Sequence, residues 1–386
     1  MSAADGKVGA GWWLRAYGLA ARRRLARLLG RPVDPHPAPP GGLRLSPSAG
    51  HLAARDDLPL RLSWSRAGNA DAEAWQTRAR AKLVELTGYR APAAPPQVLY
   101  DEAMPETHGL RRRRIYLAAA DGAGIPVNLL WRDGSAGAGP VLLYLAGSGS
   151  GVHLAWGETR IPADPLRLAI GADMGRQAAA RGYLVVCIEQ RCFGEREERD
   201  LVPRSAARCI DAFVHALLLG GTLIGENAAD VSAVVDWLHD DGAGLPVDLD
   251  RLHLFGHSSG GTLGVYAGAM DTRIRATVAS GSVGLIRDTG FRRNPEGDGV
   301  VPGILNWLEF DDIVGLHAPR PFIAVSGRRD HIFPFAGVER VVAGAEKIYA
   351  ALGAAPALCA VAGPDRHRYY PNETWAAVAD RLGVPE

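Results

Sequence analysis

The stretch Arg251-Leu-His-Leu-Phe-Gly-His-Ser-Ser-Gly-Gly-Thr-Leu-Gly264 joins an apolar run to a tight turn and a run of small residues. The apolar run, Leu252–Phe255, predicts a buried strand, and the small residues predict a helix packed close to a sheet. The turn between them is a G-x-S-x-G pattern, in which a serine on a strained strand-to-helix turn projects its hydroxyl above the sheet. Ser258 is therefore the candidate nucleophile. The alternative is a glycine-rich turn with a surface serine.

Strands and helices alternate around this stretch. Val141–Leu145 is a continuous apolar run, which is typical of a strand buried on both faces. Further strands are expected at 183–188, 277–280, 321–325 and 357–362, with helices between them. Such alternation predicts an α/β fold with a mainly parallel, twisted sheet and helices on both faces.

The N-terminal part, residues 1–69, is expected to form an extension to a main domain at 70–386. Residues 8–30 predict a basic helix with one apolar stripe, followed by a stretch rich in Pro and Gly. We expect this helix to dock on its own domain or to pair two copies in a homo-oligomer. A membrane-surface anchor is the alternative.

The main domain is expected to begin with a helix that starts at Asp71. A hairpin formed by 111–119 and 125–131 should follow. We interpret the Arg111–Arg114 run as charge protection of an edge strand, with an anion-binding patch as the alternative.

The bulk composition narrows the class of protein. The chain has 386 residues, 47% hydrophobic and 22% charged, with a net charge of +1, so no overall field favours nucleic acid. No apolar run approaches the length of a membrane span, and the N-terminus lacks a continuous apolar signal region, so we expect a cytoplasmic protein without stable membrane insertion. The four cysteines show no metal-type C-x-x-C spacing and are expected to be buried free thiols.

A serine hydroxyl needs a base, and three histidines follow Ser258 in the chain: His317, His331 and His367. His367 lies just beyond the last expected strand, where a loop can fold back over the serine. We therefore predict His367 as the base and expect His331 to be structural. A surface histidine in a turn is the alternative for His367.

The acid that orients this base should also follow a strand. Asp330 comes directly after the strand expected at 321–325. Asp311, Asp312 and Asp365 are weaker candidates, and a surface pair with an arginine is the alternative for Asp330.

Two N–H groups are needed to stabilise an oxyanion. We assign one to Ser259, directly after the nucleophile, because the helix that begins there turns its unpaired N–H groups toward the site. The other should come from the glycine-rich loop after Val141–Leu145, with Ser148 as first choice and Gly149 as the alternative. This loop lacks a complete dinucleotide or phosphate-binding fingerprint.

Several stretches together resemble α/β-hydrolases of the acetyl xylan esterase and dienelactone-hydrolase-like group, from about residue 70 to 385. They are Gly182-Tyr183 with Arg191-Cys-Phe-Gly-Glu-Arg196, Leu219-Gly-Gly-Thr-Leu-Ile-Gly-Glu226 with Asp230 and Asp236-Trp237, Leu316-His-Ala-Pro-Arg-Pro321, and Gly327-Arg-Arg-Asp330 with Phe333-Pro334. By position, the resemblance implies the same nucleophile, acid and base. Departures are Ala146-Gly147 where the group has His-Gly, and Glu189 where it has Asp.

These observations predict a serine hydrolase that cleaves a carboxylic ester through an acyl-enzyme, without metal or cofactor. Acyl transfer, amide or peptide cleavage, and a non-catalytic hydrolase-like binding protein are the alternatives. Residues 281–317 are expected to form a cap over the site. The substrate is expected to contact Gly149, His257, Trp307 and Phe310.

Overall fold

The computed structural model describes residues 21–22, 24–26, 29, 40–68, 71–133, 139–201, 209–241, 244–291 and 297–384. The chain forms two compact units, Met1–Asp57 and Leu58–Glu386. In the first unit, the described residues include the short 3-10 helix η1 (Pro40–Gly42) and helix α2 (Ser48–Asp56), which lies in the stretch rich in Pro and Gly. Most of the helix predicted at 8–30 lies outside the described residues.

The second unit starts earlier than the boundary predicted after residue 69. The backbone N–H groups of Arg61 and Leu62 donate hydrogen bonds to the carbonyls of Asn306 (3.0 Å) and Trp307 (2.9 Å). Trp75 Nε1 donates to the Leu62 carbonyl over 2.7 Å. These contacts, together with the 3-10 helix η2 (Trp64–Arg66), make this stretch part of the larger unit.

Helix α3 (Ala72–Thr87) begins directly after Asp71, as the sequence predicts. The Asp71 side chain caps its first turn by accepting from the backbone N–H of Glu73 over 2.9 Å. Gly88, in the left-handed region with φ 65°, ends it.

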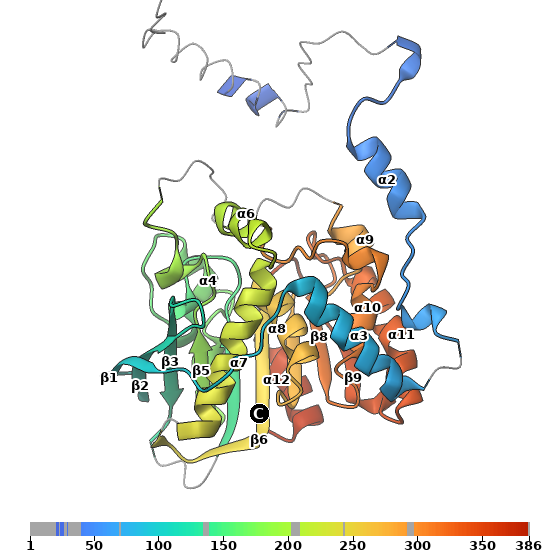
Figure 1. The fold of residues 1–386 in the computed structure, drawn as a ribbon. Coiled ribbons are helices and arrows are strands. Elements are labelled where there is room, and N and C mark those ends of the chain that lie inside the picture. The colour runs from blue at the N-terminus through green and yellow to red at the C-terminus, as the bar shows by residue number, and fades with distance from the viewer. Residues whose placement is uncertain are drawn as a thin grey trace, which may run out of the picture. The chain divides into compact units, whose positions relative to one another are not determined.

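A nine-stranded sheet forms the centre of the larger unit, in the order β1-β2-β3-β5-β4-β6-β7-β8-β9 (Figure 1). Strands β1, β2, β3 and β5 pair antiparallel, and every pairing from β5 to β9 is parallel. The prediction of a mainly parallel sheet is confirmed. The strands are β1 (Val98–Thr107), β2 (Leu110–Ala118), β3 (Gly124–Trp131), β4 (Gly139–Leu145), β5 (Leu184–Ile188), β6 (Val247–His257), β7 (Ala276–Ser280), β8 (Phe322–Gly327) and β9 (Leu358–Gly363).

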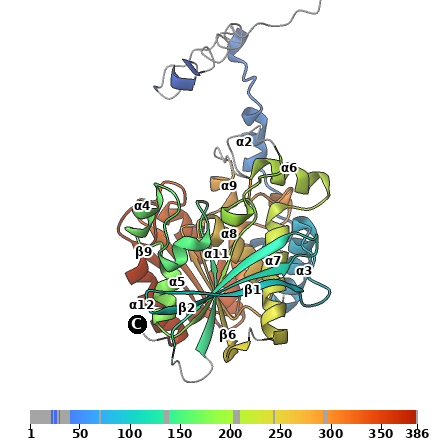
Figure 2. The same cartoon turned by 90° about the vertical axis from the view of Figure 1, so that its left-hand side faces the viewer.

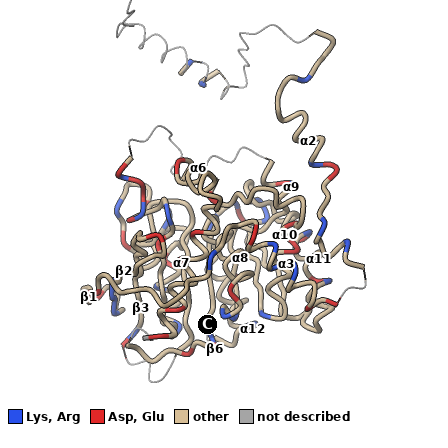
Figure 3. The backbone as a smooth tube through the Cα atoms, viewed as in Figure 1, with Lys and Arg blue, Asp and Glu red and all other residues tan. Residues whose placement is uncertain are grey.

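Strand β1 was not expected, and its presence changes the interpretation of the arginine run. β2 lies between β1 and β3, so these arginines do not protect a sheet edge. Each instead has a carboxylate partner, and Figure 3 shows acidic and basic residues interspersed along the chain. The pairs are Arg111–Asp133, Arg112–Glu158, Arg113–Asp101 and Arg114–Glu195.

Helices cover both faces of the sheet (Figure 2). Helices α5 (Met174–Ala180) and α12 (Pro371–Leu382) lie on one face, and α3, α7 (Leu223–Asp241), α8 (Ser259–Met270), α10 (Phe310–Gly315) and α11 (Phe335–Ala351) pack on the other. Alternate residues of β4 pack into two separate hydrophobic cores. Val141 and Leu143 belong to one core, and Leu142 and Tyr144 belong to the other. This two-sided burial explains the continuous apolar run.

Shorter helices lie in the connections: α4 (Asp164–Leu168), α6 (Ile210–Leu218), α9 (Ile286–Thr289), η3 (Val152–Trp156), η4 (Gly194–Arg196), η6 (Ile304–Asn306) and η7 (Ala355–Ala357). Within the described ranges, each helix taken alone is too short or too polar to cross a bilayer. The pair α6 and α7 reaches that length and composition together, with a 91° bend between them.

Candidate active site

The connections that leave the carboxyl ends of the parallel strands carry the candidate site residues. Ser258 lies between β6 and α8 with φ 52° and ψ −120°, a backbone conformation that is strained for a residue with a side chain. Its N–H donates to the Ser280 carbonyl at the end of β7 over 2.8 Å. A Cβ on Gly256 would lie 2.1 Å from the Gly260 carbonyl oxygen, and one on Gly260 would lie 2.3 Å from the Ala146 carbonyl oxygen. The two glycines of the pattern therefore allow this turn to form.

Ser258, His367 and Asp330 form a continuous chain of hydrogen bonds. His367 Nε2 lies 3.1 Å from Ser258 Oγ, and His367 Nδ1 lies 2.8 Å from Asp330 Oδ2. An ionised carboxylate can only accept, so Nδ1 carries the proton and Nε2 is left to accept from the serine hydroxyl. This is the arrangement required for His367 to act as a general base toward Ser258.

The Asp330 carboxylate is held by its own turn after β8. Asp330 Oδ1 accepts from the N–H groups of Ile332 (2.8 Å) and Phe333 (2.9 Å). Burial tends to raise the pKa of the Asp330 carboxyl, but the hydrogen bond from His367 and those from the two N–H groups outweigh it. Its pKa therefore lies below the ordinary value, which keeps the carboxylate ionised beside the imidazole.

The ring of His257 lies beside that of His367. It is buried, its Nδ1 lies 3.0 Å from Ser280 Oγ, and its ring stacks on Tyr369 with centroids 3.8 Å apart. Its ring centroid is 5.2 Å from that of His367. Burial, with the nearby His367, lowers the pKa of His257 to about 3, so this ring is neutral at physiological pH.

The loop from Ala146 to His153, which we call the 146–153 loop, follows β4 and approaches Ser258. A Cβ on Gly147 would lie 3.2 Å from both the Ser258 Cβ and the His257 carbonyl oxygen. Ser148 makes no hydrogen bond to any other described residue and lies on the wall of the cavity that contains Ser258. Ser259 lies on the same wall at the first turn of α8, where helix N–H groups lack intrahelical partners.

This cavity has a volume of about 610 Å³, in the usual range for a small-molecule site. Its wall is mainly apolar, and the segment 281–317 supplies much of it. Lining residues include Ile286, Val301, Ile304, Phe310, Ile332 and Phe333, with the more polar Thr262, Ser282 and His331.

Most of the residues predicted to contact the substrate do not line this cavity. Phe310 lines the cavity, but His257, Gly149 and Trp307 do not. The Trp307 ring faces two cations, with Lys82 Nζ 4.2 Å and Arg61 Cζ 5.2 Å from its centroid. Its side chain therefore packs against the start of the unit rather than around a ligand.

The other two histidines that follow Ser258 in the chain lie in different surroundings. His331, expected to be structural, lies on the cavity wall. His317 is buried with Nε2 2.9 Å from the Val265 carbonyl, and burial lowers its pKa well below the ordinary value. Across the described ranges, no group of three or more His, Cys, Asp and Glu side chains is arranged to hold a metal ion.

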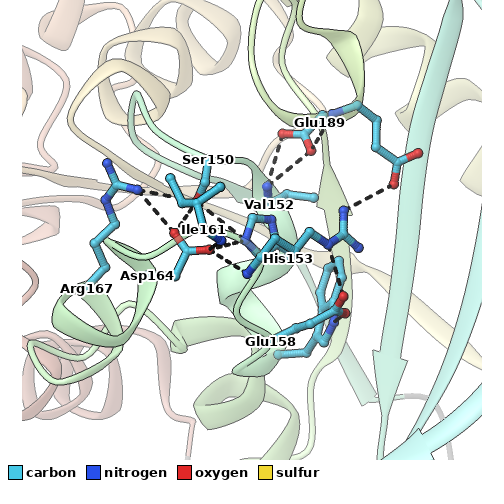
Figure 4. Close-up of polar contacts among 11 residues, drawn as sticks. Ser150, Val152, His153, Glu158, Ile161, Asp164, Arg167 and Glu189 are labelled. Carbon is cyan, nitrogen blue, oxygen red and sulfur yellow. Dashed lines mark hydrogen bonds and ion pairs between the residues drawn. The ribbon is translucent and has the colours of Figure 1, made fainter.

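The sequence reasoning missed the polar residues behind the 146–153 loop. Asp164, at the start of α4, and Glu189, directly after β5, are both buried and hydrogen-bond to this loop (Figure 4). Glu189 follows a strand, which is the same signal that located Asp330. Asp164 lies in an irregular connection and has no such signal.

Comparison with known proteins gives a match to the model of the Abhydrolase family, Abhydrolase_7, over residues 59–348. The chain is 28% identical over 177 residues to the "Putative hydrolase YtaP" of Bacillus subtilis (strain 168). That alignment covers 45% of this chain and 56% of the relative, so it spans little more than half of that protein.

Solved structures with a similar fold include three esterases. A "putative acetyl xylan esterase" from Bacteroides fragilis NCTC 9343 has a TM-score of 0.64 at 20% identity, covering 85% of this chain and 84% of that one. The glucuronoyl esterase from Solibacter usitatus has a TM-score of 0.60 at 18% identity, covering 84% and 97%. A CE15 glucuronoyl esterase from Teredinibacter turnerae T7901 has a TM-score of 0.59 at 20% identity, covering 95% and 99%.

At these identities the structural likeness concerns the fold, whereas the family model covers most of the larger unit. The chain therefore belongs to the Abhydrolase family and has the α/β-hydrolase fold.

Proposed function

We propose that this protein is a serine hydrolase that cleaves carboxylic esters. The observation that carries the proposal is the hydrogen-bonded chain from Ser258 through His367 to Asp330, next to a cavity of about 610 Å³. A surface serine in a glycine-rich turn would have neither a base in hydrogen-bonding reach nor a carboxylate behind that base.

The reaction follows from these positions. Ser258 Oγ attacks the ester carbonyl while His367 Nε2 takes its proton, and Asp330 stabilises the resulting imidazolium. The backbone N–H groups of Ser148 and Ser259 stabilise the oxyanion. His367 then protonates the leaving alcohol and activates a water molecule, which releases the acid from the acyl-enzyme.

The cavity supports an apolar acyl group of moderate size as the substrate class. Its wall is mainly apolar, and Ser258 lies on this wall together with a smaller number of polar residues. Transfer of the acyl group to an acceptor other than water, and cleavage of an amide, use the same residues and are the alternative reactions.

Initial rates with p-nitrophenyl esters from acetate to octanoate test the proposal, measured on the wild type and on Ser258→Ala. We expect hydrolysis by the wild type with a preference for one chain length, and loss of turnover in the variant. Wild-type turnover of an amide or transfer to an added alcohol, without ester hydrolysis, would favour the alternatives. Equal rates for the two proteins would contradict the role of Ser258.

A further inference from the structure

The 146–153 loop is fixed on both sides of Ser148 by side chains from other parts of the chain. Gln190 Nε2 donates to the Ala146 carbonyl over 2.5 Å. Further along, Ser150 contacts Asp164, and the Val152 N–H donates to Glu189 over 3.0 Å and 3.2 Å. The loop is therefore tethered before and after Ser148, which lines the same cavity as Ser258.

Asp164 is the most heavily connected of these tethers (Figure 4). Its side chain is fully buried, and Asp164 Oδ1 accepts from Ser150 Oγ over 2.5 Å. Asp164 Oδ2 accepts from the N–H groups of Arg160 (2.8 Å) and Ile161 (3.0 Å) and lies 2.8 Å from His153 Nε2. One carboxylate therefore joins the loop to the connection that leads into α4.

This carboxylate stays ionised. Burial alone would raise the pKa of Asp164, but the hydrogen bonds from His153, Ser150 and the backbone of Arg160 and Ile161 hold it well below its usual range. Arg167 Nη1 adds a contact of 3.3 Å to Asp164 Oδ1. Hydrogen bonds to an ionised acceptor are stronger than those between neutral groups, so the hydrogen bond from Ser150 to Asp164 is a strong one.

We propose that Asp164 is a positioning residue for the reaction, which acts through Ser150 to hold the Ser148 N–H at the place where the oxyanion forms. This inference rests on the proposed function. The loop leaves little room for displacement, because Gly147 already lies against Ser258 and His257. A shift of about 1 Å at such a point can cost about 10²-fold in rate.

The test compares Ser150→Ala, Asp164→Asn and the double variant. Ser150→Ala removes the link but leaves the other hydrogen bonds of Asp164 in place. The readouts are kcat, KM and the inhibition constant of an alkyl trifluoromethyl ketone. In this adduct the ketone carbon bonds to Ser258 Oγ, the hydroxyl proton passes to His367, and the ketone oxygen becomes an oxyanion.

We expect Ser150→Ala to lower kcat by about 10-fold to 10²-fold and to raise the ketone inhibition constant by a similar factor, with KM within about twofold. Adding Ser150→Ala to Asp164→Asn should cost little more in kcat, because Asp164→Asn already breaks the link to Ser150.

Ser232→Ala is the matched control. Ser232 Oγ donates over 2.9 Å to Asp271, another buried aspartate, which follows the far end of α8. This variant should lower the melting temperature while leaving kcat and the ketone inhibition constant unchanged.

A Ser150→Ala protein that loses thermal stability as Ser232→Ala does, with wild-type kcat and inhibition constant, would overturn the positioning role alone. So would a double variant in which the two losses multiply. A wild type that neither hydrolyses esters nor binds the ketone would instead overturn the proposed function, and this role with it.

Discussion

Phe310 and Trp307 are close in sequence, yet only Phe310 lines the cavity. We predict that Phe310→Leu, which enlarges the cavity, shifts the preferred p-nitrophenyl ester toward longer acyl chains. Trp307→Ala is the matched control and should leave the chain-length profile unchanged, because its ring packs against Lys82 and Arg61. A profile that moves with Trp307→Ala and not with Phe310→Leu would contradict this assignment of the cavity wall.

Glu189 should make stability depend on pH. Burial raises the pKa of Glu189 to about 8, against the lowering effect of the Val152 and Glu195 N–H groups. In the unfolded chain its pKa is about 4.3, so between these values the folded protein binds the extra proton and loses stability as pH rises. The free energy of unfolding of Glu189→Gln, relative to the wild type, should therefore rise from about pH 4.5 to pH 8 and then level off.

Urea unfolding at a series of pH values measures this difference. Glu158→Gln serves as the control: burial tends to raise the pKa of Glu158, but hydrogen bonds from Trp156, Arg160 and Arg112 lower it to about 2. The ionised Glu158 carboxylate stops stabilising the fold only as pH falls below about 4.3. The difference in the free energy of unfolding between Glu158→Gln and the wild type should therefore stay constant above pH 5. An equally constant difference for Glu189→Gln would show that Glu189 is ionised in the folded protein.

At the scale of elements, one buried carboxylate joins α9 to α10 and so shapes the cavity wall. Glu309 accepts from the N–H groups of Ile286 (2.6 Å) and Phe310 (2.8 Å), both of which line the cavity, and from Arg287 Nε over 2.9 Å. We predict that Glu309→Gln lowers the free energy of unfolding by about 1–3 kcal/mol, because an amide leaves some of these buried donors unpaired.

Denaturant unfolding checks this prediction, with Asp248→Asn as control. Asp248 is paired with Arg251 near the start of β6, and that pair is partly open to solvent, so its loss should not move the unfolding midpoint. A Glu309→Gln protein as stable as the wild type would mean that α9 and α10 are held together by packing alone.

The elements that the sequence predicted well are those with strong periodicity or a cap. Strands β4, β5, β7 and β8 are buried along almost their whole length and consist mainly of apolar residues, and α3 carries its capping aspartate. Strand β1 has neither signal, because nearly all of its residues are exposed and Pro105 lies within it. Helix α2 buries none of its residues, so hydrophobic periodicity gave no prediction there either.

At the scale of the whole molecule, the parallel sheet brings together residues that are far apart in sequence. Ser258, Asp330 and His367 each follow a different strand, and the carboxyl ends of those strands meet at one edge. Chain order and strand ends were therefore enough to predict these three. The stacking of His257 on Tyr369, the orientation of Trp307 and the burial of Asp164 depend on how loops fold over one another, and no spacing in the sequence reports that.

The most direct test of the account is labelling with a fluorophosphonate, followed by peptide mapping, on the wild type, His367→Ala and Asp330→Asn. The account predicts one adduct, on Ser258, formed more slowly by about 10²-fold or more in both variants, because each change removes part of the base that activates the serine. An adduct on another residue, or equal labelling rates in all three proteins, would contradict the claim that Ser258 is a nucleophile activated by His367 and Asp330.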